Sequence, residues 1–401
     1  GYADVEAKRP ISENNVFWIA SMTKMFAGAS VMMLVDEGKL SLDNPVTKFI
    51  PQLDRWMVVE EKDASHVLLK PPARPVTIRH LLSHTSGLAG SSELQQVTGS
   101  DSTPLKARAL SSVTGPLQSH PGEKYAYGNQ GMNVAARVVE VVSGMPYEEF
   151  LQKRFFDPLG MKETTYWPTE AHVVRLAGAY GPNKQKTGFT RGGIGLLTKP
   201  LSDRTRRFPE AGGGLFSTTP DILRYGLILA NDGELDGRRY LSHAAMDELR
   251  KEQTGKTKVN YSLGYHLRNG LFGHDGAYGT DLSVDPKTGM VAVFMVQCTG
   301  GDQWAARDAF LKAARKVFRS KPAGRHRYFP PASSAQTARI ASSSPSPSGT
   351  AGLGRLAKYH RRPASAGRTV RLPGICRYPF GSVFRTQSQA YRSHFARYSL
   401  G

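Results

Sequence analysis

The sequence predicts an α/β fold in which an antiparallel sheet is flanked by helices and joined to a mostly helical lobe. Three observations favour this fold. An apolar helical run follows Ser21, a stretch of helical pattern and loops extends from about residue 31 to 200, and strand-like segments return from about 205 to 318. Such layers leave a cleft between the sheet and the helical lobe, so we expect the functional site there.

The first long helix is expected to be buried. Between Met25 and Val35 the residues are apolar on almost every face, and a helix of this kind packs inside a protein. Gly38 marks its expected end. Further along, strands are expected at 262–267, 279–284 and 290–297, and a last helix at about 303–318.

Residues 1–318 are expected to form the folded domain. Within it, residues 1–30 and 205–318 make the α/β lobe and residues 31–204 the mostly helical lobe. No segment reaches the roughly 18 consecutive apolar residues of a membrane span. Cys298 and Cys376 are too few for a disulfide framework, so cysteine content does not indicate a compartment.

Residues 319–401 have a different composition. From Arg319 onward the chain holds 15 of its 53 Lys and Arg residues and none of its 33 Asp and Glu residues, and its formal net charge is +20. A basic segment rich in Ser, Pro, Ala and Gly cannot bury a core, which predicts a disordered tail. It could be an arm for nucleic acid or anionic surfaces, a solvated tail without a partner, or out-of-frame translation of GC-rich DNA. The abrupt loss of acidic residues favours the third origin.

The segment Ser21-Met22-Thr23-Lys24 is the only Ser-x-x-Lys in the chain. On a helix, residues three apart have Cβ atoms about 5–6 Å apart, so the Ser21 hydroxyl and the Lys24 amine can meet within one turn. A serine hydroxyl becomes a nucleophile when a base takes its proton. Backbone N–H groups at the start of a helix would stabilise an oxyanion. The alternative is a helix-capping serine followed by a surface lysine.

Two later segments supply further polar groups. A Tyr-Gly-Asn segment at 127–129 precedes a helical pattern, and a His-Asp-Gly segment at 274–276 lies between strand-like stretches. Taken alone, Tyr127 would be a half-buried aromatic, Asn129 a turn residue and His274 a hydrogen-bonded strand residue. Their occurrence together, after a Ser-x-x-Lys, favours a functional site.

In this order, the Ser-x-x-Lys, Tyr-x-Asn and His-x-Gly segments resemble the three motifs of the serine β-lactamase and penicillin-binding-protein superfamily. The closest likeness is to its class C-like branch, which includes D-alanyl-D-alanine carboxypeptidases and serine esterases. The resemblance covers roughly residues 1 to 318. Further similar segments lie at 17–20, 40–46, 77–88 and 211–218.

The family normally has a helix and a strand before the point where this sequence opens. The resemblance therefore implies a sequence truncated at its N-terminus, with any export signal lost. If the lost N-terminus carried an export signal, a periplasmic or secreted location is favoured; otherwise a cytoplasmic location is expected.

The resemblance assigns the catalytic roles to three residues. Ser21 is the expected nucleophile, Lys24 is expected to help take its proton, and Tyr127 to share the base role. The reference pKa of lysine is about 10.4 and that of tyrosine about 10, so the two are expected to titrate as a coupled pair.

The resemblance assigns substrate binding to four residues. Asn129 would hydrogen-bond the substrate and hold Lys24 in place, and His274 and Gly276 belong to the third motif. The backbone N–H groups of Ser21 and Ala277 would form the oxyanion hole. Because the reference pKa of histidine is near 6.5, His274 would add a charge that depends on pH, and we expect activity to respond between about pH 5.5 and 7.5.

The function implied is a serine hydrolase that forms an acyl-enzyme on Ser21 with esters, D-amino-acid peptides or β-lactams. The alternative is a catalytically silent penicillin-recognition-like domain, with a basic tail that binds nucleic acid. No cofactor or metal is implied: His80 and His84 are four apart, but no carboxylate or cysteine completes a site nearby. The chain also lacks the Gly-x-Ser-x-Gly of α/β-hydrolase esterases.

Overall fold

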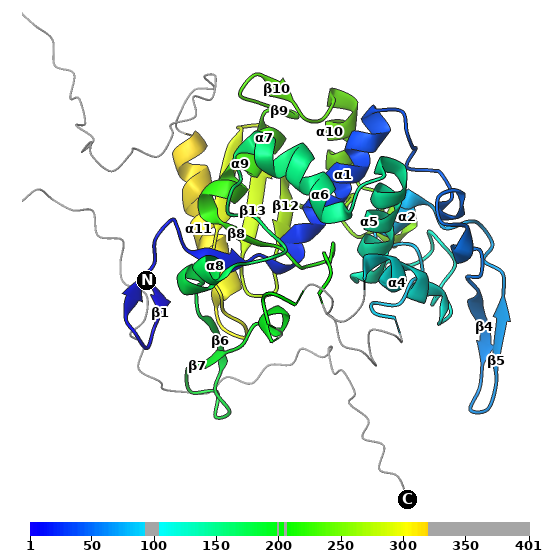
Figure 1. Cartoon of the computed structure of the whole chain (residues 1–401), viewed down its shortest axis with the longest axis horizontal. Helices are drawn as coiled ribbons and strands as arrows, with labels where there is room; N and C mark the ends of the chain where they lie inside the picture. The colour runs from blue at the N-terminus through cyan, green and yellow to red at the C-terminus, as the bar shows by residue number, and fades with distance from the viewer. Residues whose placement is uncertain (93–103, 199, 204–206, 320–401) are drawn as a thin grey trace, which may run out of the picture. The chain divides into compact units, whose positions relative to one another are not determined.

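The computed structural model describes residues 1–92, 104–198, 200–203 and 207–319 (Figure 1). Residues Gly1–Tyr328 form one compact unit. The division of this unit into two lobes stays a prediction. The tail expected at 319–401 lies, from residue 320 onward, outside the described residues. No helix among the described residues is both long enough and apolar enough to cross a membrane.

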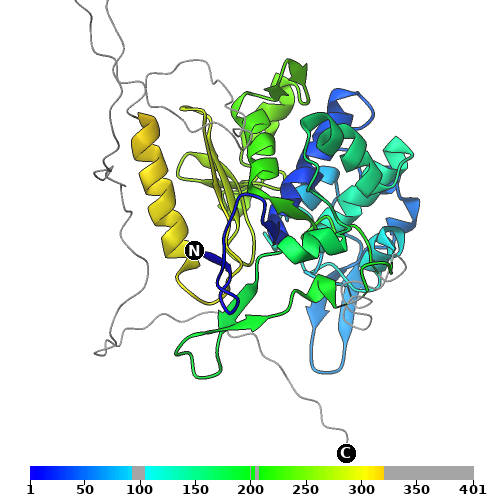
Figure 2. The same cartoon turned by 60° about the vertical axis from the view of Figure 1, so that its left-hand side comes forward.

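A four-stranded antiparallel sheet forms the centre of the α/β part. Its strands stand in the order β11 (His266–Arg268), β12 (Leu271–Asp275), β13 (Asp281–Asp285) and β14 (Met290–Phe294). Helix α9 (Thr219–Ala230) packs against β13 and β14 on one face, and α11 (Gln303–Arg319) packs against β14 on the other (Figure 2). The predicted α/β fold with an antiparallel sheet is confirmed.

Side chains on β13 and β14 alternate between the two faces of the sheet, as strand geometry requires. Leu282 and Val291 lie against Gly226 of α9, whereas Met290 and Ala292 belong to a small core with Leu311 of α11. The sequence pattern placed strands at 262–267, 279–284 and 290–297. The observed strands begin at or after these starts, and β12, which carries His274, was not expected as a strand.

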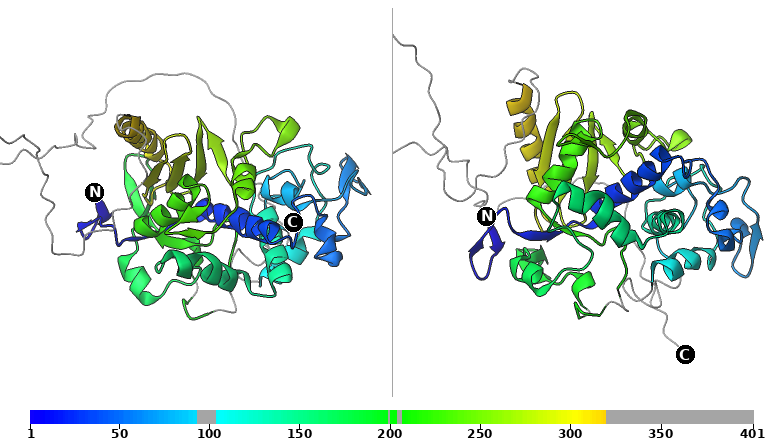
Figure 3. Two further views of the ribbon diagram at one scale, coloured as in Figure 1. Left: turned by 90° about the horizontal axis from the view of Figure 1, so that it is seen from above. Right: turned by 45° about the horizontal axis from the view of Figure 1, so that its top comes forward.

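Helix α1 (Lys24–Asp36) runs through the middle of the described unit (Figure 3). Its residues from Lys24 to Leu34 are all buried, as the apolar run predicted, and it packs against α5 (Gln130–Ser143) and α10 (His243–Arg250). A Cβ on Gly28 would lie 1.9 Å from the Leu263 carbonyl oxygen, so only glycine lets the loop before β11 rest on this helix.

Shorter helices and short antiparallel strand pairs complete the described unit. The helices are α2 (Ile78–Leu82), α4 (Leu105–Leu110), α6 (Tyr147–Leu151), α7 (Asp157–Leu159) and α8 (Glu170–Arg175). The pairs are β1 (Tyr2–Asp4) with β2 (Arg9–Pro10), β3 (Val16–Trp18) with β8 (Phe216–Thr218), β4 (Val58–Lys62) with β5 (Val67–Lys70), β6 (Ala179–Pro182) with β7 (Phe189–Gly192), and β9 (Glu234–Leu235) with β10 (Arg238–Arg239). The region expected to be mostly helical therefore also contains two β-hairpins, β4–β5 and β6–β7.

Candidate active site

Ser21 lies in a single 3₁₀ turn, Ala20–Thr23, directly before α1, and Lys24 is the first residue of the α-helix. The sequence had placed Ser21 at the start of the α-helix itself. Ala20 has a φ of +44°, a left-handed conformation that is unfavourable for alanine and that aims the following turn. The Lys24 Nζ atom lies 3.2 Å from the Ser21 Oγ atom, so the predicted meeting of hydroxyl and amine is observed.

The Lys24 amine is completely buried and has three oxygen neighbours. Besides Ser21 Oγ, it contacts Asn129 Oδ1 at 2.7 Å and the Gly212 carbonyl oxygen at 2.6 Å. These last two oxygens can only accept hydrogen bonds. In the neutral state the amine has two N–H groups, which these two acceptors use. The nitrogen lone pair then points to the Ser21 hydroxyl, which is the orientation that a general base requires.

Glu210 fixes the orientation of the Asn129 amide. The Nδ2 atom of Asn129 donates to Glu210 Oε1 at 2.8 Å, so its Oδ1 atom faces Lys24. The described contacts therefore fit the expectation that Asn129 holds Lys24. Both ends of its amide are already engaged within the protein, and its binding to a substrate stays a prediction.

Burial lowers the pKa of Lys24 to about 7, although the carboxylates of Glu210 and Asp275 act in the opposite direction. Removing the amine from water disfavours its charged form. Lys24 therefore exchanges its proton near neutral pH, which suits a group that must both take and return a proton.

Tyr127 lies beside the same amine, with the Lys24 Nζ atom 4.6 Å from its ring centroid. Tyr127 is 42% exposed, and the part of it that is removed from water raises the pKa of its hydroxyl; a hydrogen bond with Ser21 opposes the shift. The phenol is thus protonated at neutral pH. Burial outweighs the stabilisation that nearby positive charge would give a phenolate.

His274 does not carry the pH-dependent charge that the sequence suggested. Its side chain is only 2% exposed, and burial holds its pKa well below the usual range. Its Nδ1 atom lies 2.6 Å from the Asp275 carbonyl oxygen, to which it must donate, and its Nε2 atom lies 3.1 Å from the Tyr261 hydroxyl. The His84 Nε2 atom lies 3.2 Å from the same hydroxyl. His84, Tyr261 and His274 therefore form one hydrogen-bonded chain.

A cavity of about 330 Å³ opens beside Ser21. It brings together five of the predicted site residues and four that sequence reasoning did not single out. The former are Ser21, Tyr127, His274, Gly276 and Ala277, and the latter are Tyr125, His266, Asp275 and Trp304. Lys24 and Asn129 lie behind Ser21 and do not line the cavity.

Gly276 allows the third motif to approach the nucleophile. A Cβ at this position would lie 2.4 Å from the Ile19 carbonyl oxygen and 2.2 Å from Thr280 Oγ1. Thr280 Oγ1 in turn donates to the Ile19 carbonyl at 3.2 Å. The turn after β12 is thus hydrogen-bonded to Ile19, two residues before Ser21, and Ala277 in this turn lines the same cavity. An oxyanion hole made by the backbone N–H groups of Ser21 and Ala277 stays a prediction.

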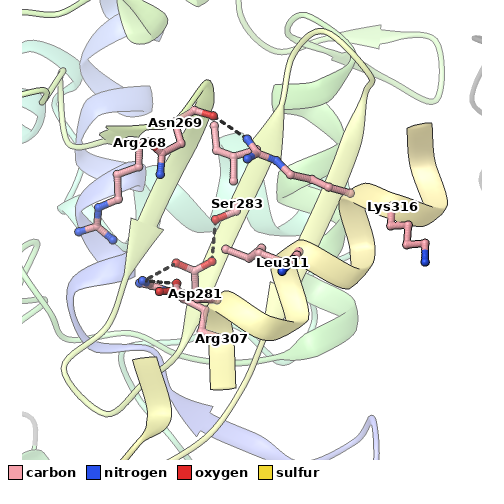
Figure 4. Close-up of a pocket in the computed structure, with 11 residues that line it drawn as sticks. Arg268, Asn269, Asp281, Ser283, Arg307, Leu311 and Lys316 are labelled. Carbon is pink, nitrogen blue, oxygen red and sulfur yellow. Dashed lines mark hydrogen bonds and ion pairs between the residues drawn. The ribbon is translucent and has the colours of Figure 1, made fainter. Parts of the chain in front are cut away.

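A second hollow, of about 700 Å³, lies elsewhere (Figure 4). It lies between α11 and the outer face of β11–β13 and is lined by side chains such as Arg268, Asp281 and Arg307. Ser21 does not reach it. Arg268 and Arg307 extend from this hollow to the Asp275 carboxylate, at 3.0 and 3.8 Å. Both arginines therefore neutralise Asp275 from behind the wall of the smaller cavity.

Several residues of the site were missed by sequence reasoning. Glu210 adjoins the 211–218 segment that was noted only for its resemblance, and His84 was considered only as half of a metal-binding pair with His80. Tyr261 directly precedes the strand expected at 262–267, and His266 lies within it. No spacing in the sequence links these four residues to Ser21, because the contacts are made between distant parts of the chain.

A serine hydroxyl that faces a buried amine, at the head of a core helix beside an antiparallel sheet, defines the serine hydrolases of the penicillin-recognition fold. The chain belongs to the β-lactamase family, whose model, described as "Beta-lactamase", matches residues 1–316.

Individual relatives have several activities in their names. A lovastatin esterase of Penicillium rubens is 32% identical over 305 residues, which are 68% of this chain and 74% of the relative. Penicillin-binding protein 4 of Amycolatopsis lactamdurans is 29% identical over 304 residues, or 71% of this chain and 73% of the relative. The structure of simvastatin synthase (LovD) from Aspergillus terreus has a TM-score of 0.65 and 19% identity, covering 81% of this chain and 90% of that one. The last comparison shows the shared fold.

Proposed function

We propose that this protein is a serine hydrolase that forms an acyl-enzyme on Ser21, and that its substrates are esters of uncharged carboxylic acids. Ser21 Oγ attacks the ester carbonyl while its proton passes to Lys24 Nζ. The protonated amine, with the Tyr127 hydroxyl beside it, returns a proton to the departing alkoxide. Water then attacks the acyl carbonyl while Lys24 takes its proton, and Lys24 returns that proton to Ser21 Oγ as the acid leaves.

The observation that carries this proposal is the environment of Lys24. Two obligate acceptors, Asn129 Oδ1 and the Gly212 carbonyl, use the N–H groups of the neutral amine and leave its lone pair for Ser21. A pKa of about 7 keeps much of the amine neutral at physiological pH. A lysine with only a structural role at the start of a helix would need neither these two acceptors nor a pKa near 7.

The charge of the cavity supports an uncharged acyl group. Among the described residues that line it there is no Lys or Arg, and the only acidic one is Asp275. The nearby Arg268 and Arg307 are already paired with that carboxylate. A β-lactam or a C-terminal D-amino-acid peptide brings a carboxylate, and no Lys or Arg among the described lining residues is placed to pair with it. Tyr125, Tyr127 and Trp304 instead offer apolar surface.

A fluorophosphonate probe tests the nucleophile. We expect the folded protein to be labelled and Ser21→Ala to remain unlabelled, while Ser65→Ala, which changes an exposed hairpin serine, is labelled like the wild type. A folded wild-type protein that takes no label would instead support the catalytically silent alternative.

A comparison of substrates tests the acyl preference. We expect p-nitrophenyl butyrate to be hydrolysed with a kcat/KM at least about a hundredfold above that of a chromogenic cephalosporin. Equal values, or faster hydrolysis of the cephalosporin, would contradict the preference for uncharged substrates but leave Ser21 as the nucleophile.

A further inference from the structure

Three side chains that line the Ser21 cavity, those of His266, His274 and Asp275, can share one ligand. The Nε2 atom of His266 lies 3.2 Å from the Oδ1 atom of Asp275, and the Nδ1 atom of His274 lies 3.8 Å from the same oxygen. One ligand atom from each of the three lies within 4.8 Å of the others, and no second such cluster occurs in the ranges that the structure describes. The arrangement follows from the antiparallel pairing of β11 with β12, in which His266 stands opposite Gly273.

These separations fit a metal ion. Zinc binds histidine nitrogen and carboxylate oxygen at about 2.0–2.2 Å in a tetrahedral arrangement, which places its ligand atoms roughly 3.3–3.6 Å apart. The distances from Asp275 Oδ1 to the two rings bracket this range. We propose that His266, His274 and Asp275 form a binding site for a divalent transition-metal ion such as Zn²⁺, with its remaining coordination position open to the cavity.

The hydrogen-bonded chain behind His274 allows this ring to become a ligand. At present its Nδ1 atom donates to the Asp275 carbonyl, and its Nε2 atom accepts from Tyr261. To bind a metal through Nδ1, the ring must carry its proton on Nε2. Tyr261 can then accept from His274 and donate to His84 Nε2, so the chain reverses.

The reversal moves one proton between the two nitrogens of each ring, so His84 then carries its proton on Nδ1, and both hydrogen bonds of Tyr261 are kept. The cost is the hydrogen bond from His274 to the Asp275 carbonyl. A metal-bound histidine usually donates its other N–H to a fixed acceptor, and the Tyr261 hydroxyl is that acceptor here.

Two arginines oppose the metal. Arg268 lies 3.0 Å from the Asp275 oxygen that the ion would use, and Arg307 lies 3.8 Å from the other oxygen. Each competes for the carboxylate and repels a cation. The site is therefore expected to bind weakly in the wild type, and removal of one competing charge should strengthen it. This reversed effect distinguishes a built site from adventitious binding to scattered histidines.

Calorimetric titration of the full chain with ZnCl₂ tests the proposal. We expect His266→Gln to weaken the binding about tenfold or more and Arg268→Met to strengthen it roughly threefold to tenfold. His243→Gln is the matched control, because His243 contacts Asp232 on the surface but belongs to no cluster of three among the described residues. The histidines and the cysteine beyond residue 319 are present in every variant, so their contribution cancels.

Unchanged Zn²⁺ affinity in His266→Gln, or weaker affinity in Arg268→Met, would overturn the proposal. Should His266→Gln fail to fold, the Co²⁺ absorption spectrum of the wild type decides. Intense visible bands of a tetrahedral N/O site that Zn²⁺ removes support it, and their absence contradicts it. Binding is measured directly, so the result stands whether or not Ser21 proves reactive.

Discussion

Burial decides the protonation state of Lys24 more than any single neighbour does. Desolvation brings its pKa to about 7, while Glu210 and Asp275 pull it back upward. Glu210 thus has two effects at once, since it also orients the Asn129 amide that accepts from Lys24. The other titratable groups facing the amine are Tyr127, His84, His266 and His274, all of which favour their uncharged forms.

The pH dependence of ester hydrolysis should report Lys24. Because the neutral amine is the base, kcat/KM should rise with pH through about 7 and then level off. Glu210→Gln keeps an acceptor for Asn129 Nδ2 but removes the charge that raises the pKa of Lys24. We therefore expect the rising part of the kcat/KM–pH curve of Glu210→Gln to move to lower pH. At pH values below the Lys24 pKa, kcat/KM should be about tenfold higher than in the wild type for each pH unit of this shift.

Steady-state kinetics from pH 5 to 9 check this shift, with Glu234→Gln on β9, whose carboxylate pairs with Arg239, as the control. A curve that stays in place, or moves to higher pH, would mean that Glu210 does not act on Lys24 through its charge.

Gly212 can be tested through its missing side chain. A Cβ here would lie 2.5 Å from both Cγ and Oδ1 of Asn129, so Gly212→Ala must displace the amide that accepts from Lys24. We expect kcat/KM to fall at least about tenfold with little change in Tm. Gly213→Ala is the neighbouring control, since its Cβ would meet nothing closer than 3.7 Å. Equal losses in both variants would point to a general effect on the loop.

At the scale of elements, the sequence predicted the helices and the sheet that hydrophobic periodicity and the order of the family motifs indicate. The buried helix α1, the helix α11 at Gln303–Arg319 and the antiparallel sheet are as expected. Two features were not predictable in this way. The 3₁₀ turn at Ala20–Thr23 depends on the left-handed Ala20, and alanine gives no signal for that conformation. Strand β12 is short and has Gly273 at its centre, so its sequence shows no apolar alternation.

The candidate site was predictable in its motifs and not in its surroundings. Ser21 and Lys24 meet because they are one turn apart, which sequence spacing shows directly. Glu210 contacts Asn129, which is 81 residues away in the sequence, and Tyr261 contacts His84, which is 177 residues away. No local sequence pattern predicts either contact. The charge of His274 was misjudged for the same reason, since its burial depends on Tyr261 and the strands around it.

The contact between α1 and the loop before β11 should be sensitive to volume. Gly28→Ala would place a Cβ 1.9 Å from the Leu263 carbonyl oxygen, so the helix and the loop must separate. Overpacking of this kind costs about 1–3 kcal/mol of unfolding free energy. Gly193→Ala, with nothing within 4 Å of its Cβ, should change stability by less than about 0.5 kcal/mol. Denaturant unfolding of both variants measures the difference, and comparable losses would refute the close approach.

At the scale of the whole molecule, chemistry and charge lie in different parts of the chain. Every residue of the proposed mechanism falls between Ser21 and Ala277, and the compact unit extends to Tyr328. The region from Arg319 onward holds 15 Lys and Arg residues and no acidic residue. If this charge attracts polyanions, the attraction should weaken steeply with salt and should not depend on the hydrolase site.

A chain that ends after Tyr328 separates these two properties. Because the compact unit keeps all its core and site residues, we expect kcat/KM for p-nitrophenyl butyrate within about twofold of the full chain and a Tm within a few degrees. Any binding of duplex DNA at low salt should fall with the basic residues removed, since phosphate contacts made by Lys and Arg dominate such binding. Loss of activity in a shortened chain that remains folded would mean that residues beyond Tyr328 take part in the site. Retained DNA binding would instead place the basic surface within the hydrolase unit itself.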